Sequence, residues 1–210
     1  MTDDLIHATA LSLRVSVAGT IVAALAGIPI GTWLGSSTFR GRRAIVVLTN
    51  TLMAMPTVLV GLLLYALLSN HGPLGMLGLL YTPTAIITGE ALLALPLLVA
   101  LSRGAVENLD PRARETAVML GAGRAGTLFV LAKEASPALA AAMLSAFGRV
   151  VSELGIALMV GGNIRGETRT LTTSMTLATA RGDFDLAVAL GGVLLVVAFS
   201  VVLTAEFLRR

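Results

Sequence analysis

The sequence predicts an all-α, polytopic membrane protein with about five transmembrane helices, arranged as one permease-like membrane domain over residues 1–210. Composition is the first observation behind this prediction: 56% of the residues are hydrophobic and 13% are charged, whereas soluble domains have about 25% charged residues. The second observation is that the apolar residues form long uncharged runs. At about 1.5 Å per helical residue, such runs can cross a hydrocarbon core of about 30 Å.

The predicted spans follow these runs in chain order. No Asp, Glu, Lys or Arg occurs from Val15 to Phe39 or from Ala44 to Gly89, and a loop rich in glycine and proline at 69–83 divides the second run. Three prolines inside the first three spans are expected to kink helices whose neighbours satisfy the freed backbone groups; they are Pro29, Pro56 and Pro96. The predicted spans are about 11–34, 44–68, 84–102, 137–160 and 186–205.

The distribution of Lys and Arg predicts the orientation. The loop after the first span holds three, the loop 103–136 holds five and the C-terminal tail holds two, all on one side if there are five spans. On the other side, the 69–83 loop has none and the 161–185 segment has three. Because basic residues favour the cytoplasmic side, we expect the N-terminus outside, and the loop 103–136 and the C-terminus in the cytoplasm of a cell that carries the protein in its plasma or inner membrane.

The loop 103–136 carries clear helix signals. Asp110 before Pro111 predicts a helix start, because an Asx side chain caps free backbone donors and proline at the first helical position loses no hydrogen bond. Gly121 and Gly123 can take the left-handed conformation that ends helices. A second helical stretch is predicted over residues 124–133, so the loop should form a short helix followed by a bend.

This segment supports a resemblance to a known family. Glu115-Thr116-Ala117 and Leu120-Gly121-Ala122, with Phe129 further on, resemble the EAA loop with which the permease subunits of ABC importers contact a cytoplasmic ATPase. Lys133 and Glu134 stand where the general pattern has Leu-Pro, a departure shared with the tungstate-type permeases. The resemblance implies a type I ABC importer permease fold. It implies ATPase coupling through Glu115, Thr116, Ala117, Leu120, Gly121, Ala122 and Gly123, whereas an ordinary basic loop is the alternative.

A second set of segments resembles the tungstate branch of this family. These segments are Glu153-Leu154-Gly155-Ile156, Gly161-Gly162-Asn163-Ile164, Thr168-Arg169-Thr170-Leu171-Thr172-Thr173 and Arg181-Gly182-Asp183-Phe184. Hydroxyl, amide and guanidinium groups are suited to hydrogen-bonding a tetrahedral oxyanion. The same groups could instead dock a binding protein or cap a helix. The candidates for an oxyanion path or outer mouth are Asn163, Arg165, Thr168, Arg169, Thr170, Thr172 and Thr173.

Three ionisable residues fall well inside predicted spans, at least six residues from either end, where a charge costs about 2.5–3.5 kcal/mol near the helix centre. They are Glu90, Arg149 and Glu153. Arg149 and Glu153 are four residues apart and can neutralise each other on one helix face. They could line a polar path, but we favour a structural ion pair because a carboxylate in the path would repel an anion. The role of Glu90 stays open.

The sequence lacks the residues that several classes of protein need for their function. There is no cysteine, the two histidines are scattered, and no nucleophile with a base or GxxxxGK[ST] motif occurs. We therefore expect no enzyme, no metal site and no cofactor in this chain, with ATP and Mg²⁺ bound by a partner ATPase. The net charge of +3 reflects basic loops beside apolar runs rather than a nucleic-acid site.

Together these features predict the permease subunit of an ATP-driven ABC importer. The resemblance implies a homodimer in the membrane lipid, cytoplasmic ABC ATPase subunits and an extracytoplasmic substrate-binding protein, with tungstate or a similar tetrahedral oxyanion crossing at the homodimer interface. A molybdate or sulfate permease is the alternative within the family. A self-contained secondary transporter or channel, and a structural subunit of a larger membrane enzyme, are alternatives from other classes.

Overall fold

The computed structural model describes residues 2–209, and within that range every regular element is a helix. In chain order the helices are α1 (Thr2–Ser36), α2 (Arg42–Met53), α3 (Thr57–Leu68), the 3₁₀ helix η1 (Gly75–Leu77), α4 (Pro83–Glu107), α5 (Pro111–Met119), α6 (Arg124–Glu134), α7 (Ser136–Val151), α8 (Gly155–Gly161), α9 (Leu171–Ala180) and α10 (Phe184–Arg209). The predicted all-α fold is confirmed.

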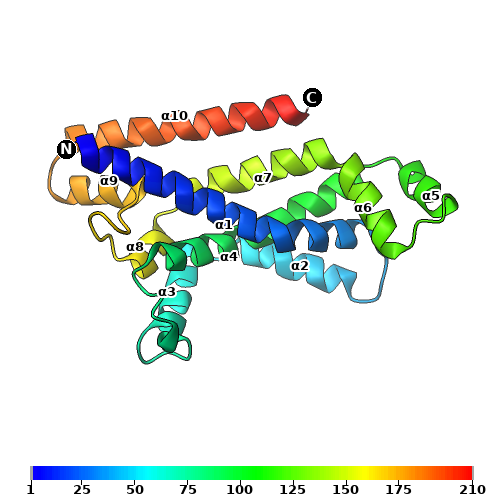
Figure 1. Ribbon diagram of the computed structural model, residues 1–210, viewed down its shortest axis with the longest axis horizontal. Coiled ribbons are helices and arrows are strands. Elements are labelled where there is room, and N and C mark those ends of the chain that lie inside the picture. The colour runs from blue at the N-terminus through cyan, green and yellow to red at the C-terminus, as the bar shows by residue number, and fades with distance from the viewer. Residues whose placement is uncertain (1, 210) are drawn as a thin grey trace.

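The long helices α1, α4, α7 and α10 run along the long axis of the molecule (Figure 1). Helix α1 packs along α4, and α7 packs against α1, α4 and α10. Helices α5 and α6 lie at one end of this bundle, whereas α9 and the N-terminus lie at the other (Figure 1). The two predicted functional regions, the loop 103–136 and the segment 161–185, therefore sit at opposite ends.

Glycines bring the backbones of α1 and α4 into close contact. A Cβ atom added at Gly31 would lie 2.6 Å from both the Ser102 Cβ and the Val99 carbonyl oxygen. Gly27 lies equally close to α4, because its Cβ would be 2.8 Å from the Leu98 Cβ. Only glycine permits this separation, which is typical of helix pairs that associate in membranes.

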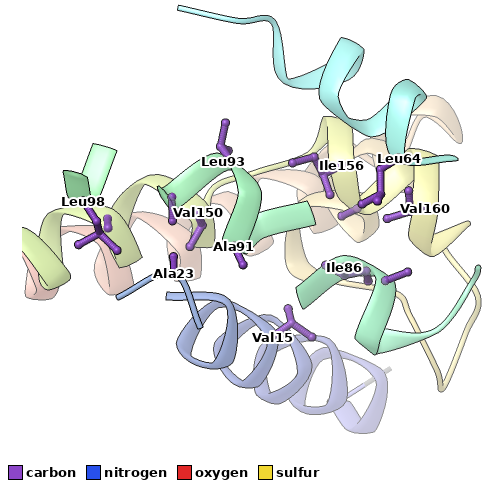
Figure 2. Packing of buried hydrophobic residues seen from close by; sticks show 14 of the residues in the cluster. Val15, Ala23, Leu64, Ile86, Ala91, Leu93, Leu98, Val150, Ile156 and Val160 are labelled. Carbon is purple, nitrogen blue, oxygen red and sulfur yellow. The ribbon is translucent and has the colours of Figure 1, made fainter. Parts of the chain in front are cut away.

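The main core lies where α4 meets α1, α3, α7 and α8 (Figure 2). Ile86, Leu98, Val150 and Ile156 are fully buried in it. A Cβ at Gly89 would lie only 2.3 Å from the Ile156 Cγ2. This contact holds the short helix α8 against α4 at Gly89.

The predicted span 44–68 is not one straight helix. It divides into α2 and α3, whose axes meet at 95°. Pro56 directly precedes α3 and lies at the break. Proline has no N–H to donate and restricts the residue before it to extended backbone, which stops α2 from continuing. Pro29 and Pro96 lie inside the continuous helices α1 and α4.

The predicted span 137–160 is also interrupted. Helix α7 ends at Val151 and α8 begins at Gly155, with Ser152 as the C-cap of α7. The Ser152 hydroxyl donates to the carbonyls of Gly148 and Arg149 at 3.4 and 3.1 Å, which closes the end of α7. The segment 161–185, predicted as a polar connection, contains the regular helix α9.

By length and composition, three helices could each cross a membrane: Asp4–Ser36, Pro83–Glu107 and Phe184–Phe207. The possible number rises to five if each of two bent helix pairs is one span. The first pair is Arg42–Met53 with Thr57–Leu68. The second is Arg124–Glu134 with Ser136–Val151, and the helices of this second pair meet at 73°. The five predicted spans agree with this upper number. Their bounds in the membrane stay a prediction.

The close approach of α1 and α4 yields a test of stability. Gly31→Ala should lower the free energy of unfolding by about 1–3 kcal/mol, because its methyl group overpacks the contact with Ser102 and Val99. Gly104→Ala in α4 is the matched control, since nothing lies within 4 Å of its Cβ. Thermal unfolding of the purified chain in detergent measures both. Equal midpoints for the two variants would contradict the tight contact.

Candidate functional site

Helix α5 has the bounds that its sequence signals predict. The Asp110 carboxylate accepts a hydrogen bond from the Arg112 backbone N–H at 2.9 Å and caps the first turn. At the other end Gly121 has φ +82°, in the left-handed region. The N–H of Ala122 donates to the Ala117 carbonyl and that of Gly121 to the Val118 carbonyl, both at 3.0 Å. These two bonds form a Schellman motif, so the chain reverses sharply after α5.

Gly123 does not take the left-handed conformation that its type allows. It has φ −67° and ψ 178°, and directly precedes α6. One left-handed residue is enough to end α5, so the extended backbone at Gly123 serves to start the next helix. The predicted second helical stretch is confirmed as α6.

The end of α5 presents exposed apolar side chains. Val118, Met119 and Leu120 are 57%, 85% and 82% exposed, and Phe129 on α6 is 70% exposed. Val118 and Met119 were absent from the predicted coupling residues. An apolar Val-Met-Leu run at the end of an otherwise polar helix is the signal that would have identified them. Among the predicted residues, Glu115 and Thr116 are exposed, whereas Ala117 is buried.

A small buried cluster connects this loop to the long helices. Val106 of α4, Leu131 of α6 and Leu139 of α7 are buried together, and Ala113 of α5 packs against them. Since close-packed side chains transmit displacements, a force on α5 would reach α4 and α7 through this cluster.

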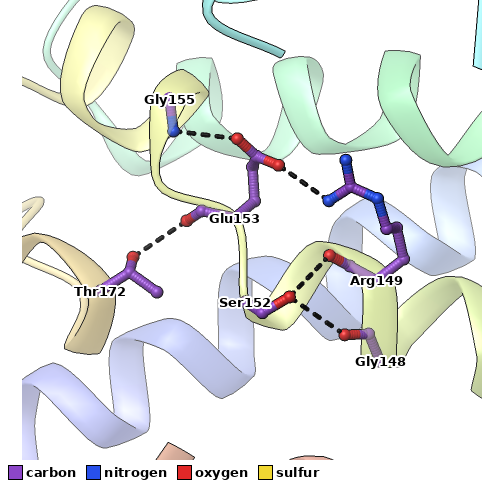
Figure 3. Close-up of polar contacts among 6 residues, drawn as sticks. All are labelled: Gly148, Arg149, Ser152, Glu153, Gly155 and Thr172. Atoms are coloured by element: carbon purple, nitrogen blue, oxygen red, sulfur yellow. Dashed lines mark hydrogen bonds and ion pairs between the residues drawn. The ribbon is translucent and has the colours of Figure 1, made fainter. Parts of the chain in front are cut away.

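The predicted ion pair between Arg149 and Glu153 is confirmed (Figure 3). Arg149 Nη1 lies 3.0 Å from Glu153 Oε2. Glu153 is in the break between α7 and α8 rather than in a continuous helix, and its Oε1 accepts from the Gly155 N–H at 2.9 Å. The two partners differ in exposure: the Arg149 side chain is 45% exposed and that of Glu153 only 4%. Only the arginine is available to a solute.

Glu90 lies apart from this pair. It is 2% exposed in α4, and its Oε2 has no hydrogen-bond partner among the described side chains. Helix α1 covers it, because a Cβ at Gly19 would lie 3.0 Å from the Glu90 Cβ and 3.4 Å from that oxygen. In the described part of the chain no ion pair involves Glu90, and nothing in its contacts assigns it a role.

The four predicted threonines of the outer segment are buried and bonded within the protein. Thr168 accepts from the Ile164 N–H at 3.0 Å and donates to the Gly161 carbonyl. Thr170 and Thr173 form the capping box of α9. Thr172 donates to the Glu153 carbonyl at 2.9 Å, which connects α9 to the break after α7 (Figure 3). These hydroxyls hold the segment in place.

The asparagine and the arginines of the segment lie closer to its surface. Arg169 Nε donates to Asn163 Oδ1 at 3.1 Å, and Asn163 has a left-handed φ of +53°. Arg165 makes a bidentate pair with Asp4, at 2.9 and 2.7 Å. The hydrogen bond that the Arg165 guanidinium donates to the Asp4 carboxylate raises the pKa of this guanidinium, so this group stays charged.

A cavity of about 420 Å³ lies against these arginines, and we call it the outer cavity because the basic loops predict this end of the bundle to be outside. It is lined by Arg165, Arg169 and Arg181 and also by the carboxylates of Asp4 and Asp183. Arginine forks can bind an oxyanion, but the carboxylates reduce the positive charge that it would meet. Among the described residues no group of three His, Cys, Asp or Glu is placed to hold a metal ion.

Comparisons with known proteins agree with this arrangement. Residues 27–209 match the family described as the binding-protein-dependent transport system inner membrane component. The chain is 39% identical over 191 residues to the tungstate uptake system permease protein TupB of Peptoclostridium acidaminophilum, covering 91% of this chain and 84% of that protein. It is 28% identical over 208 residues to the molybdenum transport system permease protein ModB of Azotobacter vinelandii, covering 95% and 92%.

A solved structure shows the same fold. A chain of the methionine ABC transporter MetNI, in an inward-facing conformation, superposes with a TM-score of 0.74 at 16% identity, covering 100% of this chain and 98% of that chain. The fold of this chain is therefore shared with a chain of an ABC transporter that has a distant sequence. The extent of the family match and the identity to TupB show that this chain belongs to the binding-protein-dependent transport system inner membrane components, the permease subunits of ABC importers.

Proposed function

We propose that the chain is the homodimeric permease of a tungstate importer driven by a separate ABC ATPase, with a binding protein that delivers the oxyanion from outside. The names of the relatives support the substrate class, because both tungstate and molybdate permeases align over most of the chain. The form of helix α5 is the observation that supports coupling between this chain and the ATPase. It is a capped helix at one end of the bundle whose exposed apolar tip offers a surface for a partner.

The coupling mechanism follows from the contacts of α5 and α6. A nucleotide-driven movement of the ATPase subunits would displace α5, and the cluster of Val106, Leu131 and Leu139 would pass this displacement to α4 and α7. Two copies of the chain could then rock between inward-open and outward-open states about the two-fold axis. This mechanism requires α5 to lie in the cytoplasm, where the distribution of basic residues predicts it.

The exposure of Arg149 supports the proposal that the oxyanion crosses the membrane at the homodimer interface. An arginine that faced lipid at the level of the helix break would cost about 2.5–3.5 kcal/mol, so intramembrane arginines face a polar space or a partner. The Arg149 side chain is 45% exposed in a single chain, whereas its carboxylate partner is turned into the protein. In the proposed homodimer this face would line the path, with Glu153 screened from the anion and the Arg149 guanidinium in one cavity with Glu206 of α10.

Replacement of Gly121 tests the coupling proposal. Gly121→Val should uncouple uptake from ATP hydrolysis, because a β-branched residue at φ +82° costs about 1–2 kcal/mol and distorts the reversal after α5. Gly182→Val is the matched control: Gly182 has φ +77°, also with nothing within 4 Å of its Cβ, but lies between α9 and α10. ATPase binding and tungstate uptake are measured in vesicles that contain the complex. Normal uptake in Gly121→Val vesicles would rule out coupling through α5.

Replacement of Arg149 tests the path proposal. Arg149→Gln should reduce tungstate uptake about 10–100-fold, since a hydrogen bond to a charged group contributes about 1.5–3 kcal/mol. The single variant also leaves Glu153 buried without its partner, so the double variant Arg149→Gln with Glu153→Gln is needed. If Arg149 contacts the anion, the double variant inserts normally and still fails to transport. Recovery of uptake in the double variant would show that Arg149 only neutralises Glu153.

The choice between oxyanions rests on the binding protein, because tungstate, molybdate and sulfate are all tetrahedral dianions. We expect the co-expressed binding protein to bind tungstate more tightly than molybdate or sulfate in calorimetric titrations. A preference for molybdate would favour the alternative that the relation to ModB supports. Uptake by the chain without any ATPase would instead indicate a self-contained transporter.

A further inference from the structure

A cavity of about 620 Å³ lies where the connection between α1 and α2 meets α5 and α6. Figure 1 shows this connection beside α6, at the end of the bundle opposite α9. The cavity combines two guanidinium groups with hydroxyls and aromatic rings, and none of the described residues that line it is acidic. The residues used below are Trp33, Thr38, Phe39, Arg114, Arg124 and Thr127.

The positive charge of this cavity is not balanced within the chain. Over the residues whose side chains are described, no ion pair involves Arg114 or Arg124. Arg42, at the same end of the bundle, pairs with Glu107. The outer cavity, in contrast, includes two carboxylates beside its arginines. Of these two cavities, the one at α5 and α6 therefore has a pair of arginines without an acidic residue in its described lining.

The depth of this cavity corresponds to the boundary between membrane and water. The uncharged run that begins in α1 ends at Phe39, three residues after this helix, and the uncharged part of α4 ends directly before Arg103. These two points lie at one level, because a Cβ at Gly35 would be 2.8 Å from the Arg103 carbonyl oxygen. Trp33 and Phe39 stack at this level with ring centroids 4.8 Å apart. Aromatic residues are enriched at the level of lipid headgroups.

We infer that this cavity binds the phosphate of an anionic phospholipid headgroup, with Arg114 and Arg124 as its charged donors and the hydroxyl of Thr38 beside them. The Thr127 hydroxyl also lines the cavity but already donates to the Gly123 carbonyl at 3.1 Å. Guanidinium forks match phosphate oxygens, and basic pockets between membrane helices bind such headgroups. The aromatic pair would lie against the glycerol backbone and upper acyl chains. Assignment to the inner leaflet rests on the orientation in the proposed function.

A bound headgroup would have a mechanical consequence. Helix α5 packs chiefly against α6, and the cavity bridges these two helices and the end of α1. A phosphate held by Arg114 of α5 and Arg124 of α6 would therefore tie the coupling segment to α1. Anionic lipid should then support coupled ATP hydrolysis.

Lipid retention by the whole complex tests this inference. The permease is purified with its ATPase, placed in nanodiscs of phosphatidylcholine alone or with about one-third phosphatidylglycerol, and analysed by native mass spectrometry after gentle delipidation. The double variant Arg114→Gln with Arg124→Gln should bind phosphatidylglycerol about 30-fold more weakly, since each basic residue near an anionic surface contributes about fivefold. The control, Arg112→Gln with Arg181→Gln, removes two exposed arginines that do not line this cavity and should retain the lipid.

Three outcomes would overturn the inference. Equal retention of phosphatidylglycerol by both double variants would show that the cavity does not bind it. Loss of the ATPase from the Arg114 and Arg124 variant, with lipid retained, would assign the cavity to the protein contact. Displacement of the lipid by excess inorganic phosphate, with equal stabilisation by phosphate in phosphatidylcholine alone, would assign it to a soluble anion. None of these measurements uses oxyanion transport, so a failure of the proposed substrate would leave the lipid result standing.

Discussion

A helix that stops inside a membrane leaves backbone groups without partners, and Glu153 supplies partners where α7 stops. Its carboxylate accepts from the Gly155 N–H at the start of α8 and pairs with Arg149 of α7, while its carbonyl accepts from Thr172 of α9. Without water to replace these bonds, each unsatisfied group would cost several kcal/mol. Glu153 therefore contributes to the positions of α8 and α9, together with the contact of Gly89 with Ile156 and the hydrogen bond from the Leu171 N–H to the Ser12 hydroxyl.

The sequence predictions were most accurate where residues close in the chain determine the ends of a helix. They were less accurate where other interactions determine where a helix ends. Helix α5 was predicted closely because Asp110, Pro111 and Gly121 act within one turn of its ends. The break at Ser152 was predicted as part of a continuous span and Pro56 as a kink within one, since both spans are mostly apolar. In such a run, composition shows that a segment is buried in the membrane but contains little information on where its hydrogen bonds change partners.

The outer segment shows why residue type alone is a weak guide to a binding site. A run of threonines has the groups that bind an oxyanion, but a buried hydroxyl must find a partner within the protein. Thr168, Thr170 and Thr173 use theirs to close the loop and cap α9. Arg165 and Arg169 have longer side chains that reach the cavity, and their role in binding an oxyanion stays a prediction. The cavity itself depends on α1 and α10, which only the fold brings near.

The arginines discussed above lie at three places in the molecule, and the neighbouring carboxylates determine what each arginine can bind. In the outer cavity Asp4 already occupies the fork of Arg165. At the end of α7, the buried Glu153 carboxylate pairs with Arg149, whose side chain stays 45% exposed and lines a cavity together with Glu206. At α5 and α6 no acidic group lines the cavity. A permanent ligand such as a lipid phosphate fits there, because uncompensated charge favours retention over passage.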